Sequence, residues 1–597
     1  MRTRIARSAL LITAATLAAG SVAAVPGTAS ASAPSLGSTT TPIKHVIVII
    51  GENHSFDNVF ATYTPPRHQR IENLLSEGIV NADGTPGPDF ARARQLTASD
   101  TGTYTLTPAV TGAYQTLPQP NTTYVAPGCD GLPGNSPDTR FPADLPDGPF
   151  QITKYVPYND SHAGYTGGCE FPGAFVGDPL HRFYQMWQQS AGGHDQLATW
   201  VANTAGDDNG ASTPAPIFQG AVSMGFYSMA EGDAPYLRQL AERYAISDNY
   251  HQAVQGGTGA NHIVLGTGWA ASFQDANGTP VVPPAGEIEN PNPRPGTNNS
   301  YSQDGYGSAA QPGKGGSYSE CANSAAPGVS AVDAYLATLP YKAWNGCQPG
   351  RYSLLNNYNP GYNVDGTLDT ATYTVPPQKT GYHTIGDALS AKNISWAYYG
   401  EGYVNGTVQP QYCGICDPMQ YSSSIMTNPA LRANTQHGLA DFLTAAKNGT
   451  LPAVSFLKPG DDDSHPGYST LTAFETFVRN AIQAVRSNQK EWRSTAIFIT
   501  MDESGGYYDS GYIQPVSFLG DGPRVPLIVV SPWARHGAVD HTYNDHVSIL
   551  KFIEANWHLS PLSSNGEDNL PDPAPGVYRP HDAPAIGDLM TLFAFRR

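Results

Sequence analysis

Two short apolar runs in this sequence each end abruptly in acidic or amide side chains. These side chains are Glu52 and Asn53 after residues 46–50, and Asp502 and Glu503 after residues 495–501. Such runs are typical of buried parallel strands, and open α/β sheets bind their ligands at the carboxyl ends of those strands. Carboxylate and carboxamide oxygens side by side suit a divalent cation that holds a phosphate. A helix cap or an acidic turn is the structural alternative at each place.

A threonine flanked by glycines is the candidate nucleophile. Thr258 lies in residues 255–262, Gln-Gly-Gly-Thr-Gly-Ala-Asn-His, and Asn261 follows it by three positions. Flanking glycines expose a hydroxyl and leave backbone amides free to meet an oxyanion. A Gly-Thr-Gly turn by itself is more often structural, so this interpretation depends on the acidic strand ends elsewhere in the chain.

Three histidines could supply proton transfer or positive charge at a phosphate. They are His181 within residues 178–183, His465 within residues 458–467 and His546 within residues 543–548. A lone histidine is more often structural, and His546 also suits a helix start. The acidic run at residues 461–463 is interpreted as a solvated loop, with a secondary Ca²⁺ site as the alternative.

Short apolar runs bounded by turn residues predict the strands of one sheet. They are residues 46–50, 394–399, 453–457, 495–501 and 525–530. Apolar periodicity predicts helices over residues 181–189, 236–244, 331–337, 472–487 and 547–556. Strands that alternate with helices favour a mostly parallel sheet covered on both faces.

Two long segments, residues 83–150 and 274–380, are rich in turn residues. We expect them to be insertions around one catalytic domain, residues 32–597, rather than domains with cores of their own. The 40% hydrophobic content excludes wholesale disorder.

Charge excludes one class of protein. The 597 residues carry a net charge of −18 and include only 32 lysines and arginines. A nucleic-acid-binding protein would need a basic stripe, and none is visible, so we expect no nucleic-acid partner. Nothing in the sequence indicates an obligate protein partner.

The first 31 residues have the pattern of a secretory signal peptide. Three arginines precede an apolar stretch over residues 9–25, and residues 29–31, Ala-Ser-Ala, provide small side chains for signal peptidase. No adjacent arginine pair is present, which favours Sec export. We therefore predict a secreted protein whose mature chain begins near Ser32.

Six cysteines follow the predicted signal peptide, and an even number in an exported chain favours disulfides. Six allow fifteen pairings, of which we favour the sequential one, Cys129–Cys169, Cys321–Cys347 and Cys413–Cys416. The Cys-Gly-Ile-Cys segment at residues 413–416 could instead be half a zinc site or a redox motif.

Together these segments resemble the bacterial phosphoesterase family of secreted phospholipases C and acid phosphatases, in the alkaline-phosphatase superfamily. Residues 52–57 match the Glu-Asn-x-Ser-Phe-Asp of that family, and residues 502–506 match its Asp-Glu-x-Gly-Gly. Thr258 and Asn261 keep the spacing of its Gly-Pro-Thr-His-Pro-Asn-Arg motif, although the other side chains differ. Residues 458–467 resemble its Lys-Pro…His-Pro-Gly segment.

The resemblance implies an alkaline-phosphatase-like three-layer α/β sandwich with a mostly parallel central sheet and long loop insertions. It also implies a secreted hydrolase of phosphoric esters that acts through a phosphothreonine at Thr258. His465 and His181 would bind the phosphoryl group or protonate the leaving group, and Asn261 and His546 would bind substrate. The implied metal ligands are Glu52, Asn53, Asp502, Glu503 and Thr258. Hard oxygen ligands favour Ca²⁺, Mg²⁺ or Mn²⁺, with Zn²⁺ as the alternative.

The substrate stays open between phosphomonoesters and phospholipid-type phosphodiesters, with at most transient contact with a membrane surface. Acid phosphatases of the family carry His-His-Gln-Pro where this chain has Ile-Cys-Asp-Pro at residues 415–418. The role of that histidine is therefore absent or taken by another residue, such as Asp417. A sulfatase would need a Cys/Ser-x-Pro-x-Arg motif, which the segment after Thr258 lacks. A non-catalytic secreted surface-binding protein on the same fold is the remaining alternative.

Overall fold

A computed structural model describes residues 34–122, 136–158, 177–205, 219–300, 316–371, 373–466, 469–581 and 583–595. The chain divides into two units, residues 1–33 and residues 34–597, and all described residues lie in the second. The predicted signal peptide lies outside the described residues, as do Cys129 and Cys169.

A seven-stranded sheet forms the centre of the described unit. In spatial order its strands are β12 (Trp396–Gly400), β15 (Val454–Lys458), β1 (His45–Gly51), β16 (Thr495–Met501), β17 (Leu527–Val530), β6 (Ala245–Ser247) and β18 (Ala538–Asp540). Only β17 runs against its neighbours, because its pairings with β16 and β6 are antiparallel and the other four pairings are parallel. The prediction of a mostly parallel sheet is confirmed.

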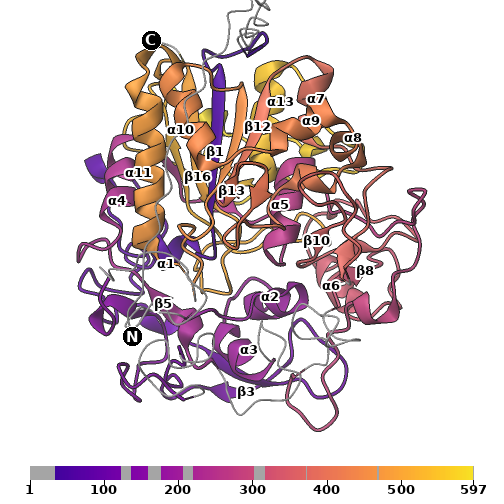
Figure 1. Cartoon of the computed structure of the whole chain (residues 1–597). Coiled ribbons are helices and arrows are strands. Elements are labelled where there is room, and N and C mark those ends of the chain that lie inside the picture. Colours follow the sequence, from indigo (N-terminus) through magenta and orange to yellow (C-terminus); the bar gives the residue numbers. More distant parts are fainter. Residues whose placement is uncertain are drawn as a thin grey trace, which may run out of the picture. The chain divides into compact units, whose positions relative to one another are not determined.

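Helices cover both faces of this sheet, which gives three layers (Figure 1). One layer contains α4 (Pro235–Arg243), α10 (Leu439–Asn448) and α11 (Leu471–Ser487), and the other contains α5 (Thr258–Thr267), α7 (Ile385–Ala391) and α13 (Val547–Trp557). α11 begins where the Thr470 side chain accepts a hydrogen bond from the amide of Ala473, and it buries an apolar stripe that includes Phe474 and Val478. The α/β sandwich that the sequence predicts is therefore present.

Central strand β1 brings the candidate site residues together. All seven of its residues are buried, and its parallel register with β16 places Gly51 opposite Met501. The parallel strand β15, on the other side of β1, ends at Lys458. Because the carboxyl ends of parallel strands meet at one edge of a sheet, the segments after all three strands leave the sheet side by side.

Shorter elements surround this core. The remaining helices are α1 (Phe56–Phe60), α2 (Phe183–Ser190), α3 (Ala198–Thr204), α6 (Val329–Leu336), α8 (Ser423–Met426), α9 (Pro429–Arg432) and α12 (Gln489–Trp492). Two-stranded pairs are formed by β2 (Leu96–Ser99) with β3 (Ala109–Ala113), β4 (Phe150–Gln151) with β5 (Gly225–Phe226), β7 (Tyr250–His251) with β19 (Asn544–Asp545), β8 (Tyr318–Ser319) with β9 (Ser353–Leu354), β10 (Asn359–Pro360) with β11 (Thr374–Val375), and β13 (Tyr403–Val404) with β14 (Thr407–Val408). Among the described helices, none is long and apolar enough to span a membrane.

The turn-rich insertions share their apolar contacts with other parts of the chain. Phe141 and Phe150 of the first insertion belong to one buried cluster with Phe226 and Tyr507. Tyr318 and Tyr358 of the second belong to another with Ile263 of α5. The disulfides Cys321–Cys347 and Cys413–Cys416 are formed, so two of the three predicted pairings are confirmed.

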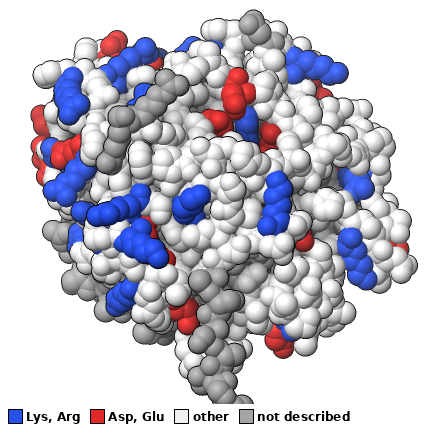
Figure 2. Space-filling model, turned by 90° about the horizontal axis from the view of Figure 1, so that it is seen from above, with Lys and Arg blue, Asp and Glu red and all other residues white. Residues whose placement is uncertain are grey.

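Charged side chains are scattered over the face seen in Figure 2. Basic and acidic residues alternate there with wide uncharged areas, and the described residues of that face show no continuous basic stripe. This pattern gives no electrostatic track for a polyanion on the face that is visible.

Candidate active site

The segments after β1 and β16 are joined directly by hydrogen bonds. The amide of Asn53 donates to Oδ1 of Asp502 at 3.3 Å, and the amide of His54 donates to the carbonyl oxygen of Glu503 at 3.1 Å. These two segments are separated by about 450 residues in the sequence. The sheet therefore brings together the two acidic strand ends, as the sequence predicts.

Backbone geometry at Asn53 explains part of the Glu-Asn and Gly-Gly motifs. Asn53 has a φ of 63°, in the left-handed region that asparagine tolerates better than most residues. Gly505 packs so closely against it that a Cβ atom on Gly505 would lie 2.6 Å from Cβ of Asn53. A side chain at residue 505 would therefore push the two strand ends apart.

Glu52 is held by a buried lysine that the sequence-based assignment did not include. Nζ of Lys458 lies 2.6 Å from Oε1 of Glu52 and 3.0 Å from Oδ2 of Asp463, and all three residues are buried. Burial alone would raise the pKa of Glu52, but the Lys458 ammonium outweighs it and lowers that pKa to about 2. Glu52 is therefore ionised at ordinary pH, with Oε1 held by Lys458.

The prediction that residues 461–463 form a solvated acidic loop is wrong for Asp463. This side chain is only 2% exposed. It accepts hydrogen bonds from Lys458 Nζ and from the amide of His465, which satisfy its oxygens in the interior. Burial needs a counter-charge, and Lys458 provides it. Lys458 directly follows an apolar strand in the sequence, which is the signal that could have identified it.

Asp502 is the buried carboxylate near Glu52 with which Lys458 forms no ion pair. Burial, together with the negative charge of Glu52, raises the pKa of Asp502 to about 7. Oδ2 of Asp502 and Oδ1 of Asn53 are buried and have no hydrogen-bond partner. A bound divalent cation would contact these two unpartnered oxygens and neutralise the Asp502 carboxylate, so this donor set fits one. Glu52, Asp502 and Glu503 do not all come within 4.8 Å of one another, so a shared ion would draw them closer.

Thr258 lies beside these carboxylates as the first residue of α5. Its Oγ1 donates to Oε1 of Glu503 at 3.3 Å, and the residue is 4% exposed. A helix N-terminus favours anions, because its first amides are not used within the helix. Apolar periodicity does not reveal α5, since its residues are buried all round. The hydroxyl nevertheless lies where the Gly-Thr-Gly motif predicts, against the acidic strand ends.

Asn261 braces the loop that precedes Thr258. Its Oδ1 accepts a hydrogen bond from the amide of Val254, and its Nδ2 donates to the carbonyl oxygen of Gly256 at 2.8 Å. The residue is fully buried. Contact with a phosphoryl group would require this side chain to give up these bonds. In the structure Asn261 instead holds the backbone of the segment that precedes Thr258.

His465 and His181 both direct Nε2 towards the site, because Nδ1 of each ring bonds to a backbone carbonyl oxygen. Nδ1 of His465 lies 2.7 Å from the carbonyl oxygen of Pro466, and Nδ1 of His181 lies 2.6 Å from that of Pro179. Carbonyl oxygens only accept, so we assign the proton to Nδ1 in both rings. Nε2 of His465 lies 2.9 Å from Nδ2 of Asn53, and Nε2 of His181 lies 3.8 Å from Oε1 of Glu503. Both rings therefore turn Nε2 towards the strand ends.

Nearby acids keep His465 basic. Burial alone would lower the pKa of His465, but the charges of Asp178 and Glu52 outweigh it and raise that pKa. Asp178, His181 and His465 form a group whose ligand atoms all lie within 4.8 Å of one another. Asp178 was not identified from the sequence, although it stands three positions before His181.

His546 lies apart from these groups. Its Nδ1 accepts a hydrogen bond from the amide of Ala253 at 3.5 Å and its Nε2 donates to the carbonyl oxygen of Met501 at 3.0 Å. Burial lowers its pKa to about 4, so the ring is neutral at ordinary pH. Among the described contacts it joins the end of β16 to the segment before Thr258. Asp417, suggested as a histidine substitute, caps the short helix at Pro418–Tyr421 instead.

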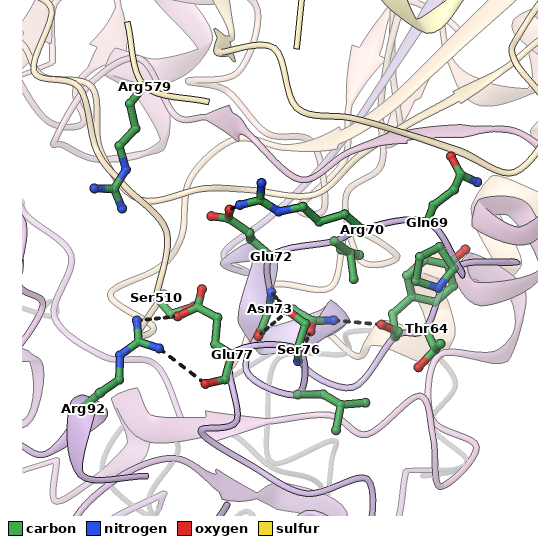
Figure 3. Close-up of a pocket in the computed structure, with 14 residues that line it drawn as sticks. Thr64, Gln69, Arg70, Glu72, Asn73, Ser76, Glu77, Arg92, Ser510 and Arg579 are labelled. Atoms are coloured by element: carbon green, nitrogen blue, oxygen red, sulfur yellow. Dashed lines mark hydrogen bonds and ion pairs between the residues drawn. The ribbon is translucent and has the colours of Figure 1, made fainter. Parts of the chain in front are cut away.

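A hollow of about 580 Å³ opens elsewhere and holds none of the predicted site residues. Its lining includes Arg70, Arg92, Arg579, Glu72 and Glu77 (Figure 3). Figure 3 shows Arg92 reaching Glu77, and the ion pair measures 2.9 Å. Size alone therefore does not identify the site; the candidate active site is identified by converging polar groups.

Fold and site together define an α/β protein with its candidate active site at the carboxyl edge of a mostly parallel sheet. Within that class the chain belongs to the phosphoesterase family, whose model matches residues 43–560. The match begins just before β1 and ends after α13, so it includes every candidate site residue.

Curated relatives are phospholipases C. The non-hemolytic phospholipase C of Burkholderia pseudomallei is 29% identical over 309 residues, covering 44% of this chain and 42% of that protein. The hemolytic phospholipase C of Pseudomonas aeruginosa is 26% identical, and the match covers 39% of this chain and 34% of the relative. The match thus spans less than half the length of these two relatives. Phospholipase C B of Mycobacterium tuberculosis is 24% identical over 587 residues, 93% of this chain and 78% of that protein.

Solved structures show weaker likeness. A protein in the alkaline phosphatase superfamily from Vibrio parahaemolyticus has a TM-score of 0.24 at 10% identity, covering 54% of this chain and 59% of that one. The phosphonate monoester hydrolase SpPMH from Silicibacter pomeroyi has a TM-score of 0.20 at 14% identity, covering 55% and 69%. The family assignment rests on the match along residues 43–560.

Proposed function

We propose that this protein is a secreted, metal-dependent hydrolase of phosphoric esters that acts through a phosphothreonine at Thr258. The observation that carries the proposal is the Thr258 hydroxyl itself. It lies at a helix N-terminus, hydrogen-bonded to Glu503, beside two strand ends that supply buried oxygen ligands. The names of the relatives, all phospholipases C, support phosphoric esters as the substrate class.

The metal-binding residues in this proposal are Glu52, Asn53, Asp502, Glu503 and Thr258. A divalent cation bound there would neutralise the buried carboxylates and lower the pKa of the hydroxyl. The all-oxygen donor set favours Ca²⁺, Mg²⁺ or Mn²⁺ over Zn²⁺.

The side chains of the site divide the remaining work. Oε1 of Glu503 accepts the Thr258 hydrogen bond and is placed to take its proton as Oγ1 attacks phosphorus. In this proposal His465 and His181 stabilise the phosphoryl oxygens. Because nearby acids raise the pKa of His465, its Nε2 can take a proton once it gives up its contact with Asn53, and it then donates that proton to the departing alcohol. Water then hydrolyses the phosphothreonine. Asn261 and His546 contribute by holding the Thr258 loop and the end of β16 in place.

Both substrate types suit this arrangement. A monoester presents more negative oxygens to His181 and His465, whereas a phospholipid-type diester presents a larger second alcohol. The relatives' names favour the diester for this chain, with transient contact at a membrane surface. A non-catalytic surface-binding protein would leave the buried hydroxyl and carboxylates without a use.

Hydrolysis of two chromogenic esters tests the proposal. We expect p-nitrophenyl phosphorylcholine or p-nitrophenyl phosphate to be cleaved, and turnover to stop with EDTA. Thr258→Val should reduce kcat by at least about a thousandfold, because the attacking oxygen is removed. Thr267→Val on the same helix, also 4% exposed, is the matched control and should keep its activity.

The outcomes separate the alternatives. Preference for the diester indicates a phospholipase C, and preference for the monoester indicates a phosphatase. Substantial activity of Thr258→Val would remove this residue from its role, and no cleavage of either ester with Ca²⁺, Mg²⁺ or Mn²⁺ restored would favour the binding protein. Mass spectrometry of the exported chain tests the predicted start near Ser32.

A further inference from the structure

A second group of ligand-type side chains includes Glu52 together with residues outside the strand-end site. Glu52, His262 and Cys416 each offer one ligand atom, and these atoms all lie within 4.8 Å of one another. All three residues are at most 3% exposed. Sγ of Cys416 is 3.7 Å from Oε1 of Glu52. Because this sulfur is in a disulfide it has no proton to donate, and the contact is not a hydrogen bond.

His262, a member of this group, has an unused ring nitrogen. Its Nε2 is buried and has no hydrogen-bond partner, although the residue is only 1% exposed. The ring also hydrogen-bonds to the backbone carbonyl of Cys416, which leaves that bond to Nδ1. A histidine whose Nδ1–H is held by a carbonyl oxygen presents a lone pair on Nε2, which is the usual arrangement of a metal-binding histidine.

The disulfide with Cys413 is what blocks a metal ion from this group. A thiolate ligand needs its sulfur lone pairs and negative charge, and a disulfide sulfur has lost that charge. Cys413 is half-buried whereas Cys416 is fully buried, so a reductant reaches Cys413 first and leaves Cys416 as the released thiolate.

We propose that reduction of the Cys413–Cys416 disulfide creates a zinc-type metal site formed by Cys416, His262 and Glu52. One sulfur, one imidazole nitrogen and one carboxylate oxygen are the ligand types that Zn²⁺ and Co²⁺ take, with a fourth position left for water. This site shares Glu52 with the all-oxygen donor set of the proposed function but adds a sulfur and an imidazole nitrogen, whereas the all-oxygen set suits harder cations.

A dithiol provides the electrons for this step. One of its thiolates attacks Sγ of Cys413, the bond to Cys416 breaks, and the second thiol of the reagent closes a ring disulfide as it releases Cys413. Two electrons and two protons pass from the dithiol to the two cysteines. When the ion binds, the Cys416 thiol gives its proton to solvent and its sulfur lone pair to the metal.

Occupation of the new site would compete with Lys458 for Glu52. Lys458 Nζ lies 2.6 Å from the same Oε1 that faces Cys416, so a bound ion displaces the ammonium from that oxygen. If the proposed function is correct, zinc under reducing conditions then lowers catalytic activity. Metal binding itself does not depend on that function.

Cobalt spectroscopy on two single variants tests the site. Cys413→Ser and Cys416→Ser remove the same disulfide, but only Cys413→Ser leaves the Cys416 thiol in place. Without any reductant, Cys413→Ser should bind Co²⁺ with a thiolate-to-cobalt charge-transfer band, and Cys416→Ser should not. The wild type should gain the band only after dithiol treatment. Ions in the all-oxygen site give no such band, so they do not interfere.

Two further measurements complete the test. His262→Ala in the Cys413→Ser protein should weaken Co²⁺ binding by at least about tenfold, since changes outside a ligand set already cause that much. Circular dichroism checks that the variants are folded. Three outcomes would each overturn the proposal. The charge-transfer band could occur in both cysteine variants, it could be absent from a folded Cys413→Ser protein, or its strength could be unchanged by His262→Ala. Absence of esterase activity from the wild type, with the cobalt band as expected, would count against the proposed function alone.

Discussion

Two regions of this protein bury several carboxylates, and they differ in what neutralises them. At the candidate active site, Glu52 is paired with Lys458, and Glu52 keeps a low pKa of about 2. Beside α13, Asp521, Asp545 and Glu567 are all fully buried. Within the described residues none of these three forms an ion pair with a lysine or arginine. Burial raises the pKa of Asp545 to about 7, and burial together with Asp545 raises the pKa values of Asp521 and Glu567 well above their usual range.

Access to solvent also separates the two regions. The side chain of His465 at the first is 12% exposed and Thr258 is 4% exposed, whereas the three acids of the second are 0% exposed. The first region therefore has some contact with solvent, while the acids of the second have none. Buried acidity alone does not indicate a functional site; a partial counter-charge, an orphaned amide oxygen and partial exposure to solvent distinguish the first region from the second.

Removal of Lys458 should give the largest effect on stability. Lys458→Met would leave Glu52 and Asp463 buried without their cation, and we expect the free energy of unfolding to fall by about 3–5 kcal/mol. Urea titration of the metal-free protein measures it. The exposed Lys490→Met is the control and should stay within about 0.5 kcal/mol. An equal, small change in both variants would mean that Lys458 does not compensate the site.

A divalent cation should stabilise the first region and not the second. At about one hundred times its Kd, Mg²⁺ or Ca²⁺ should raise the free energy of unfolding by about 2.7 kcal/mol in the wild type. Asp502→Asn should abolish most of this gain, because it removes a proposed ligand. Asp545→Asn should keep the gain in full, and its loss there would place the ion beside α13. Thermal denaturation with and without the ion provides the measurement.

A pH dependence of opposite sign is expected for Asp545 of the second region and Glu52 of the first. Because the pKa of Asp545 is raised from 3.8 to about 7, the folded state binds the extra proton, and its stabilisation is lost as the pH rises through this interval. Each such group contributes at most about 1.4 kcal/mol per pH unit. Asp545→Asn should flatten the fall of unfolding free energy between about pH 4 and 7.

Glu52 acts in the reverse direction. Its pKa is lowered from 4.5 to about 2, so its stabilisation is present above its ordinary pKa and is lost as the pH falls towards 2. Urea titrations from pH 2 to 8 test both regions at once. A slope between pH 4 and 7 that Asp545→Asn leaves unchanged would show that the second region does not hold these protons.

Much of the sheet could be predicted from the sequence. Each predicted strand has a counterpart in the central sheet, because residues such as those of β1 and β16 are apolar on both faces and so indicate burial without any partner being known. β6 and β18, at three residues each, carry too little periodicity to be recognised. The reversed direction of β17 is not visible in its residues, since antiparallel and parallel central strands can share the same apolar run.

The site was predictable where residue type and position at a strand end coincide. Glu52, Asn53, Asp502 and Glu503 follow buried strands, so adjacency in one sheet brings them together. Asn261 and His546 were assigned to substrate by resemblance, and the structure engages their side chains with the backbone. That difference depends on loop packing, which leaves no periodic signal.

The sequence by itself determined the apolar strands, the polar residues at their ends and the likeness to phosphoesterases, because these are local patterns of a few neighbouring residues. The tertiary structure alone decided which buried charges are paired. It joined Lys458 to Glu52, and it placed Cys416 and His262 close to the same carboxylate, although Glu52 and Cys416 lie 364 positions apart. Such contacts depend on how strands and loops pack in space, and the free energy of a buried charge depends on those neighbours.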